Sequence, residues 1–321
     1  MKRLGEIALR LLGVLLLVAA FGFAATKAPD RPLDTLVARW APPPSDFIDL
    51  DGLIVHLRDQ GPRNDATPIV LIHGTSASLH TWEGWARALR GQRRVISLDL
   101  PGFGLSGPWG GAYADAHYDG AAWTRFVLDL LDQLGVQRFV VAGNSLGGEI
   151  AWRLAIAAPQ RVQRLILVDA AGYAFEPESV PLGWRLARLP GAAWLGQYLL
   201  PRALIAQGLH AVYGDPARVD AALIDRYYEL TLREGNRAAL AQRLRDLDRG
   251  RDEARIATLR LPTLILWGGR DRLLPPATAQ RFHTDIAGSR LAVFDALGHV
   301  PQEEDAAATA AAVAAFWKEV P

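Results

Sequence analysis

The chain of 321 residues contains no cysteine, and its net charge is only +1 at pH 7. Without cysteine it can have no disulfide, no thiolate metal ligand and no cysteine nucleophile. The charge balance argues against a nucleic-acid-binding protein, which would carry a basic stripe or patch. No internal repeat, no glycine-rich nucleotide loop and no clustered His, Asp and Glu spacing is present. We therefore expect no cofactor, no metal and no nucleic-acid partner.

The longest apolar run lies at the N-terminus. Lys2 and Arg3 precede it, and it extends from Ile7 to Ala25 with Arg10 as its charged interruption. A signal-peptide core is about 7–15 residues long and a membrane span about 20. Basic residues before such a run favour export of the chain on its C-terminal side. We expect residues 1–27 to be a membrane anchor or uncleaved signal, with the rest of the protein outside the cytoplasm. The alternatives are a cleaved signal with soluble export, and a buried helix of a cytosolic protein.

The next segment, residues 28–46, is rich in proline. It contains Arg31-Pro32 and the run Pro42-Pro43-Pro44, and we interpret it as an extended linker. After it, Asp51-Gly52 stands between two apolar stretches, Phe47–Leu50 and Leu53–Leu57. Because Asp-Gly favours tight two-residue turns, this pattern predicts a β-hairpin.

From residue 47 onward, half-buried helices alternate with short apolar strands. The predicted strands are Pro68–Ile72, Arg94–Leu98, Phe139–Ala142, Leu165–Val168, Thr263–Trp267 and Arg290–Phe294. The predicted helices are Trp82–Leu89, Tyr118–Leu134, Glu149–Ala158 and Gln302–Lys318. This alternation is typical of the α/β class with a mainly parallel sheet.

The alternation breaks between Tyr173 and Asp252, where helical segments rich in Leu, Ala and Arg replace the strands. We expect this block, residues 173–252, to form a helical cap over the carboxyl edge of the sheet, where open α/β sheets bind ligands. The predicted core is then residues 47–172 and 253–321. Some of the cap's apolar residues should line a pocket; they include Leu186, Leu189, Trp194, Leu195, Leu199, Leu200, Leu204, Ile205, Leu209 and Val212.

A Gly-x-Ser-x-Gly pattern, Gly143 to Gly147, joins a predicted strand to a predicted helix. In this elbow a strained turn presents a serine hydroxyl at the edge of a parallel sheet. The glycines leave room where strand and helix nearly collide. The helix start brings unpaired N–H groups and a positive dipole end toward the serine. The pattern therefore indicates Ser145 as a nucleophile.

A serine hydroxyl needs a neighbouring base, and the base needs an acid that orients it. His299 follows a late strand, and Gly298 before it permits the turn that aims the ring over the sheet. Asp271 follows the strand Thr263–Trp267 and a Gly-Gly turn, so it is the expected acid. Asp169, at the end of the preceding strand, is the alternative for that role.

A reaction through a tetrahedral intermediate also needs two N–H donors for the oxyanion. One is expected from Leu146, which follows the nucleophile, and the other from the loop after an early strand. Thr75, in the loop Ile72–Ser78, is the best candidate for the second. We expect His73, at the start of that loop, to brace it by a hydrogen bond.

Together these motifs resemble the α/β-hydrolase-fold enzymes with a cap domain, from about Phe47 to the C-terminus. The motifs are His73-Gly74, Asp99-Leu100-Pro101-Gly102-Phe103-Gly104, Gly143-Asn144-Ser145-Leu146-Gly147-Gly148, Trp267-Gly268-Gly269-Arg270-Asp271 and Gly298-His299. The resemblance implies Ser145 as nucleophile, Asp271 as acid, His299 as base, and Thr75 and Leu146 as oxyanion donors. Serine at position 145 disfavours relatives with an aspartate nucleophile, the haloalkane dehalogenases and epoxide hydrolases.

The expected activity is hydrolysis of carboxylic esters of small apolar substrates through an acyl-enzyme. The elbow Gly-Asn-Ser-x-Gly-Gly is similar to that of the meta-cleavage carbon–carbon bond hydrolases, which supplies one alternative. An acyltransferase or a cofactor-free perhydrolase on the same site is another. A catalytically inactive binding module on this fold is the alternative outside enzymes.

Overall fold

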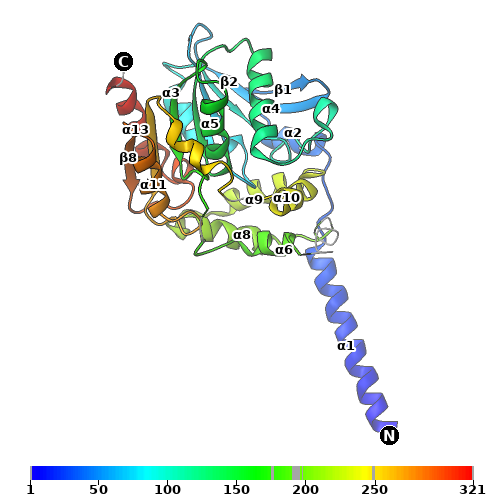
Figure 1. Ribbon diagram of the computed structural model, residues 1–321. Helices are drawn as coiled ribbons and strands as arrows, with labels where there is room; N and C mark the ends of the chain where they lie inside the picture. The colour runs from blue at the N-terminus through cyan, green and yellow to red at the C-terminus, as the bar shows by residue number, and fades with distance from the viewer. Residues whose placement is uncertain (1, 175–176, 190–195, 197, 248–249, 320–321) are drawn as a thin grey trace.

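The computed structural model describes residues 2–174, 177–189, 196, 198–247 and 250–319. Within them the strands form one eight-stranded sheet of order β1-β2-β4-β3-β5-β6-β7-β8 (Figure 1). The strands are β1 (Ser45–Leu50), β2 (Leu53–Gln60), β3 (Ile69–Ile72), β4 (Val95–Leu98), β5 (Phe139–Asn144), β6 (Val162–Val168), β7 (Thr263–Gly268) and β8 (Arg290–Phe294). β2 pairs antiparallel with β1 and β4, and every other pairing is parallel. The sheet is therefore mainly parallel, and the predicted α/β-hydrolase fold is confirmed.

Helices cover both faces of the sheet, which explains why its central strands are wholly apolar. α3 (Glu83–Leu89) and α13 (Ala306–Glu319) pack on one face, with the buried Trp82 and Trp85 in that core. α4 (Gly120–Gln133), α5 (Leu146–Ala157) and α11 (Ala277–Asp285) pack on the other. The parallel strands all end at one edge of the sheet, so the loops that follow β3, β5, β6 and β7 come together there.

The predicted strands and helices of the core are present, with small shifts at their ends. The largest difference is at the C-terminus, where the single predicted helix is two: α12 (Pro301–Glu304) and α13. The predicted helix that begins at Trp82 is preceded by a 3₁₀ turn, η1 (Leu79–Trp82). Shifts of this kind are ordinary for helix boundaries.

Between β6 and β7 the chain leaves the sheet and forms a layer of helices below its carboxyl edge (Figure 1). The described helices of this layer are α6 (Leu182–Ala187), α8 (Arg202–Val212), α9 (Ala221–Thr231) and α10 (Asn236–Arg245). Trp194 and Leu195, predicted to contribute to its apolar interior, lie outside the described residues. The layer is tied directly to the core, because the backbone N–H of His299 donates to the carbonyl of Val212 at 2.7 Å.

The proline-rich segment of residues 28–46 is not extended throughout, so that part of the linker prediction is wrong. It contains a helix, α2 (Asp34–Trp40), whose Leu36 is buried against Leu105 and Leu230. The physical reason is an apolar face at helical spacing, formed by Leu33, Leu36 and Trp40, which packs on both core and cap.

The N-terminal helix α1 (Lys2–Thr26) extends away from the body of the protein as a separate rod (Figure 1). Its end is joined to the cap by two backbone hydrogen bonds, Leu200 N–H to Thr26 at 3.0 Å and Ala28 N–H to Tyr198 at 2.7 Å. Large apolar side chains along it are exposed, with Leu17 at 72% and Phe21 at 78%. Among the described residues, no helix combines the length and hydropathy needed to cross a bilayer. Export and anchoring stay predictions.

Candidate active site

Ser145 lies at the turn between β5 and α5, with φ 55° and ψ −116°. This conformation is unfavourable for a residue with a side chain and is typical of strained functional positions. The neighbouring glycines are sterically required: a Cβ on Gly143 would lie 2.0 Å from the carbonyl oxygen of Gly147, and one on Gly147 2.1 Å from that of Ile72. The backbone of β3, β5 and α5 therefore forces the serine into this turn.

The structure brings the expected acid and base into direct contact. His299 Nδ1 and Asp271 Oδ2 are 2.7 Å apart, and both side chains are buried. Asp271 Oδ1 also accepts the backbone N–H groups of Leu273 at 2.8 Å and Leu274 at 2.9 Å. Since a carboxylate only accepts, Nδ1 of the histidine carries the proton and Nε2 is left to act as a base.

Ser145 and His299 line the same cavity of about 440 Å³. The serine side chain has no hydrogen bond to any described residue, so the contact between its Oγ and His299 Nε2 is not formed in this state. Unliganded sites often hold such pairs loosely and tighten them around the substrate. His299 and Asp271 are thus in direct contact, and Ser145 lines the same cavity as His299.

Asp169, the alternative acid, lies at the end of β6 but does not bond to the histidine. Its Oδ1 accepts the N–H of Gly268 at 3.0 Å, and its carboxyl group faces that of Asp271. Complete burial, and then the charge of Asp271, raise the pKa of Asp169 well above 3.8. Two carboxylates this close cannot both be ionised in a buried site. The raised pKa therefore favours the protonated, neutral form of Asp169.

Asp169, Asp271 and His299 are also the one group of described side chains with atoms close enough to surround a metal ion, within 4.8 Å of one another. The donor set fits a metal poorly. His299 Nδ1 and Asp271 Oδ2 are already joined by the 2.7 Å hydrogen bond, and Asp271 Oδ1 already accepts two backbone N–H groups.

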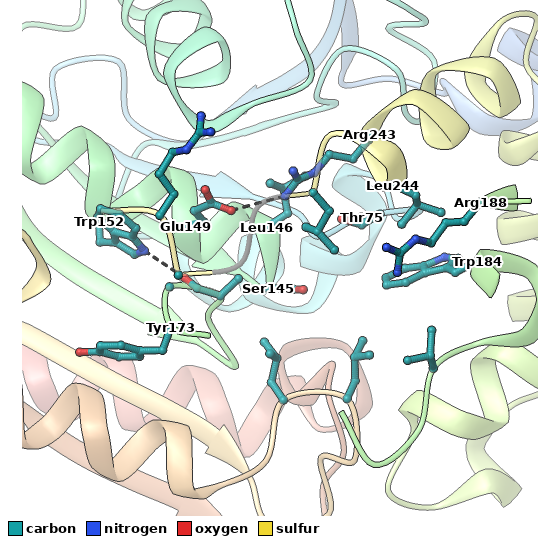
Figure 2. A pocket seen from close by; sticks show the side chains of 18 residues that line it. Thr75, Ser145, Leu146, Glu149, Trp152, Tyr173, Trp184, Arg188, Arg243 and Leu244 are labelled. Atoms are coloured by element: carbon teal, nitrogen blue, oxygen red, sulfur yellow. Dashed lines mark hydrogen bonds and ion pairs between the residues drawn. The ribbon is translucent and has the colours of Figure 1, made fainter. Parts of the chain in front are cut away.

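The two expected oxyanion donors lie beside Ser145. Thr75 and Leu146 line the space around it (Figure 2), and neither backbone N–H has an acceptor among the described residues. Leu146 is the first residue of α5, so its N–H has no partner within the helix. Free N–H groups at this point can hold an oxyanion.

His73 has the bracing role predicted for it. Its Nδ1 donates to the carbonyl of Gly74 at 2.7 Å, and its Nε2 accepts the N–H of Leu100 at 3.0 Å. Burial lowers the pKa of His73, which keeps the ring in the neutral form that this pair of bonds requires. The ring thereby fixes the loop that carries Thr75.

Glu304 is a site residue that motif reasoning missed. Its Oε2 accepts the N–H of Gly298 at 2.8 Å and of Gly214 at 3.0 Å, and its Oε1 accepts that of Asp215 at 2.8 Å. One buried carboxylate thus joins the histidine loop to the cap. Two of its three donors lie 90 and 89 residues away in the chain, so no local signal could have found it.

The cavity at Ser145 is walled mainly by the cap, and it reaches from the sheet edge to Thr26 at the end of α1. Leu189, predicted among the apolar cap residues, is instead 53% exposed. The predicted cap residues that do line the cavity are Leu186, Leu199, Leu200, Leu204, Ile205, Leu209 and Val212.

Comparison with known proteins finds two hydrolases and an acetyltransferase component among the similar sequences. The chain is 32% identical to 2-hydroxy-6-oxo-2,4-heptadienoate hydrolase of Pseudomonas putida over 79% of this chain and 88% of that one. It is 32% identical to 2-hydroxymuconate semialdehyde hydrolase of a Pseudomonas species, over 84% and 92%. It is also 32% identical to the acetyltransferase component of the acetoin cleaving system of Pseudomonas putida over 75% of its length, but spans only 60% of that protein.

Among solved structures, a bacterial membrane phospholipase A is similar with a TM-score of 0.67 and 27% identity, over 100% of this chain and 99% of that one. A variant of the meta-cleavage product hydrolase CumD is similar with a TM-score of 0.72 and 25% identity, over 86% and 98%. The family model of the alpha/beta hydrolase fold matches residues 67–306. With this match over most of its length, the chain belongs to the α/β-hydrolase fold family.

Proposed function

We propose that the protein is a serine hydrolase that cleaves carboxylic esters with apolar acyl chains. His299 would take the proton of the Ser145 hydroxyl as Oγ attacks the ester carbonyl, and Asp271 would stabilise the imidazolium that forms. The N–H groups of Thr75 and Leu146 would hold the oxyanion. The alcohol leaves with the proton from His299. Water activated by the same histidine then releases the acid and restores the serine.

The observation that carries this proposal is the cavity beside Ser145. Its volume of about 440 Å³ suits a long hydrocarbon chain, and leucine, isoleucine and valine side chains far outnumber the one arginine in its described lining, Arg237. Each methylene group buried there would stabilise the complex by about 0.8 kcal/mol. The similarity along the whole chain to a protein described as a membrane phospholipase A also favours an acyl ester as substrate.

The second candidate is a carbon–carbon bond hydrolase of the meta-cleavage type. It is favoured by two relatives named as hydrolases of 2-hydroxy-6-oxo-2,4-heptadienoate and of 2-hydroxymuconate semialdehyde. Each is 32% identical to this chain, and the matches cover 88% and 92% of their lengths. An acyltransferase or perhydrolase would use the same acyl-enzyme with an acceptor other than water.

The two candidates are separated by measuring kcat/KM for p-nitrophenyl esters of short, medium and long acyl chains beside a dienoate ring-cleavage product. We expect turnover of the esters, highest for the longer chains. In Leu204→Trp, which fills the cavity, the preferred chain should become shorter. Leu189→Trp, on the exposed surface outside the cavity, is the matched control and should keep the wild-type profile. Turnover of the dienoate alone would contradict the ester proposal.

We further propose that the protein is exported and associates with a membrane through residues 1–27. Apolar side chains exposed along α1 support this. The test is membrane fractionation of the full chain beside a chain that starts at Ala28. The full chain should sediment with membranes and the shortened one should not; equal partition would reject the proposal.

A further inference from the structure

A second chamber, of about 80 Å³, opens from Ser145 and is distinct from the apolar cavity. The two share Thr75, Ser145, Trp184 and Leu273 in their walls. In Figure 2, Arg243 is seen next to Leu146 and Arg188 next to Trp184. A single water needs roughly 10–15 Å³, so the chamber has room for a polar group of several atoms. We call it the arginine chamber.

The charged side chains of the arginine chamber are three arginines and one glutamate: Arg188, Arg243, Arg251 and Glu149. Its described lining thus has an excess of positive charge beside the nucleophile. Guanidinium groups match the oxygens of phosphate in both charge and geometry. Most other lining residues are apolar, among them Trp152, Val180 and Leu244, so the arginines are the groups that would hold an anion there.

Arg243 is the central residue of this chamber. Arg243 is only 5% exposed, and its buried Nε has no hydrogen-bond partner. Its polar contacts are long, 3.5 Å from Nη2 to Glu149 Oε2 and 3.4 Å from Nη1 to the carbonyl of Tyr118.

The negative charge of Glu149 is shared between two arginines, because its Oε1 also accepts a hydrogen bond from Arg153 at 3.1 Å. Burial lowers the pKa of Arg243, and the nearby carboxylates only partly oppose this. Arg243 is thus a buried cation with only long contacts from Nη1 and Nη2, in the wall of a cavity that also contains Ser145, where an anion would offset its charge.

An ester presents two parts to its nucleophile, the acyl chain and the alcohol, and two chambers meet at Ser145. We propose that the arginine chamber binds a phosphate group on the alcohol side, so that the preferred substrate is an acyl ester of a phosphorylated alcohol, as in an acylglycerol phosphate. The inference rests on the proposed ester hydrolysis. The acyl chain would lie in the apolar cavity, and the leaving alcohol would depart past Arg243 and Arg188.

The test compares kcat/KM for a long-chain 1-acylglycerol 3-phosphate with that for the monoacylglycerol of the same chain. The wild type should prefer the phosphate ester. In Arg243→Gln the ratio of the two values should fall about tenfold or more, and Arg243→Lys should restore part of it. Arg188→Gln, at an exposed position, should lower the ratio without a risk to folding. Arg245→Gln, exposed on the same helix and outside the chamber, is the matched control.

A binding measurement supplies an independent readout. Glycerol 3-phosphate should inhibit hydrolysis of a neutral p-nitrophenyl ester competitively in the wild type, and much more weakly in Arg243→Gln. Wild-type hydrolysis of both glycerol esters with no preference for phosphate would overturn the inference and leave ester hydrolysis standing. Hydrolysis of neither, nor of any p-nitrophenyl ester, would overturn both. A ratio unchanged in Arg243→Gln and Arg188→Gln would reject the arginine chamber as the phosphate site.

Discussion

The carboxyl group of Asp169 faces that of Asp271, which in turn accepts the hydrogen bond from His299 Nδ1. The three side chains come from the ends of β6 and β7 and from the loop after β8. Asp271 accepts hydrogen bonds from the histidine and from two backbone N–H groups, whereas burial raises the pKa of Asp169 and favours its protonated form. We therefore expect Asp169 to be neutral and to position the acid by donating a hydrogen bond to it.

Asp169→Asn should therefore keep most of the activity. An asparagine amide can donate to Asp271 while its oxygen accepts the Gly268 N–H, as the protonated carboxyl group does. Asp169→Leu should lose activity, because it leaves Asp271 without this donor. The measurement is kcat/KM on a p-nitrophenyl ester. A loss in Asp169→Asn as large as in Asp271→Asn would show that Asp169 itself acts as the ionised acid.

The same residue predicts a pH effect on stability. Its folded pKa lies above its ordinary value of 3.8, so above that pH the folded protein binds more protons than the unfolded chain. The contribution of Asp169 to the free energy of unfolding must then fall as pH rises from 3.8 toward the folded pKa. Asp169→Asn should therefore gain in stability relative to the wild type as the pH rises, in urea unfolding at a series of pH values. A difference that stays constant with pH would contradict the protonated state.

Acid should weaken the fold at His80. This buried ring donates from Nε2 to the carbonyl of Trp40 at 2.8 Å and accepts at Nδ1 from the hydroxyl of Ser78 at 3.0 Å, so it is neutral. Burial lowers the pKa of His80 from 6.5 to about 4. The unfolded chain binds the proton at a higher pH than the folded protein does. The free energy of unfolding therefore decreases as the pH is lowered from 6.5 to about 4, by at most about 1.4 kcal/mol per pH unit. His80→Gln should flatten this part of the urea-unfolding profile; an unchanged slope would count against it.

The elbow predicts a steep requirement for glycine. Gly147→Ala places a Cβ 2.1 Å from the carbonyl oxygen of Ile72, and backbone there cannot move without disturbing β3. We expect the free energy of unfolding to decrease by about 1–3 kcal/mol. Gly91→Ala, which has no atom within 4 Å of the added Cβ, should change it by less than about 0.5 kcal/mol. Comparable urea midpoints for the two variants would contradict the close approach.

Glu304 should act through the position of His299. Glu304→Gln replaces one of the two acceptor oxygens with an amide, which then faces backbone N–H donors from Gly298, Gly214 or Asp215. A small displacement of a catalytic group lowers the rate, here by about tenfold to a hundredfold in kcat. Glu234→Gln, at an exposed position, is the control. Full activity in Glu304→Gln would show that the histidine loop holds its place without this carboxylate.

Local features explain which parts of the protein the sequence could predict. The strands follow from uninterrupted apolar runs, and the elbow from glycines that no other residue can replace sterically. The pairing of His299 with Asp271 was predictable because each follows a strand of a parallel sheet, and such strands end at the same edge.

Long-range contacts explain the features that the sequence did not reveal. Helix α2 is stable because Leu36 packs on Leu230 from the cap, a contact that the proline-rich flanks conceal. Glu304 bonds to backbone groups of two distant segments, and the charge of Arg243 matters only because α10 buries it beside Ser145. Side-chain chemistry of this kind depends on packing that no periodicity encodes.

The central claim is that Ser145 is the nucleophile, and covalent labelling tests it most directly. The wild type should react with a fluorophosphonate probe and gain the mass of one adduct, located by peptide mass spectrometry at Ser145. Ser145→Ala should gain no adduct, and its urea midpoint should equal that of the wild type, which shows that the variant is folded. A wild type that takes up no probe, or a Ser145→Ala variant labelled as fast as the wild type, would contradict the assignment.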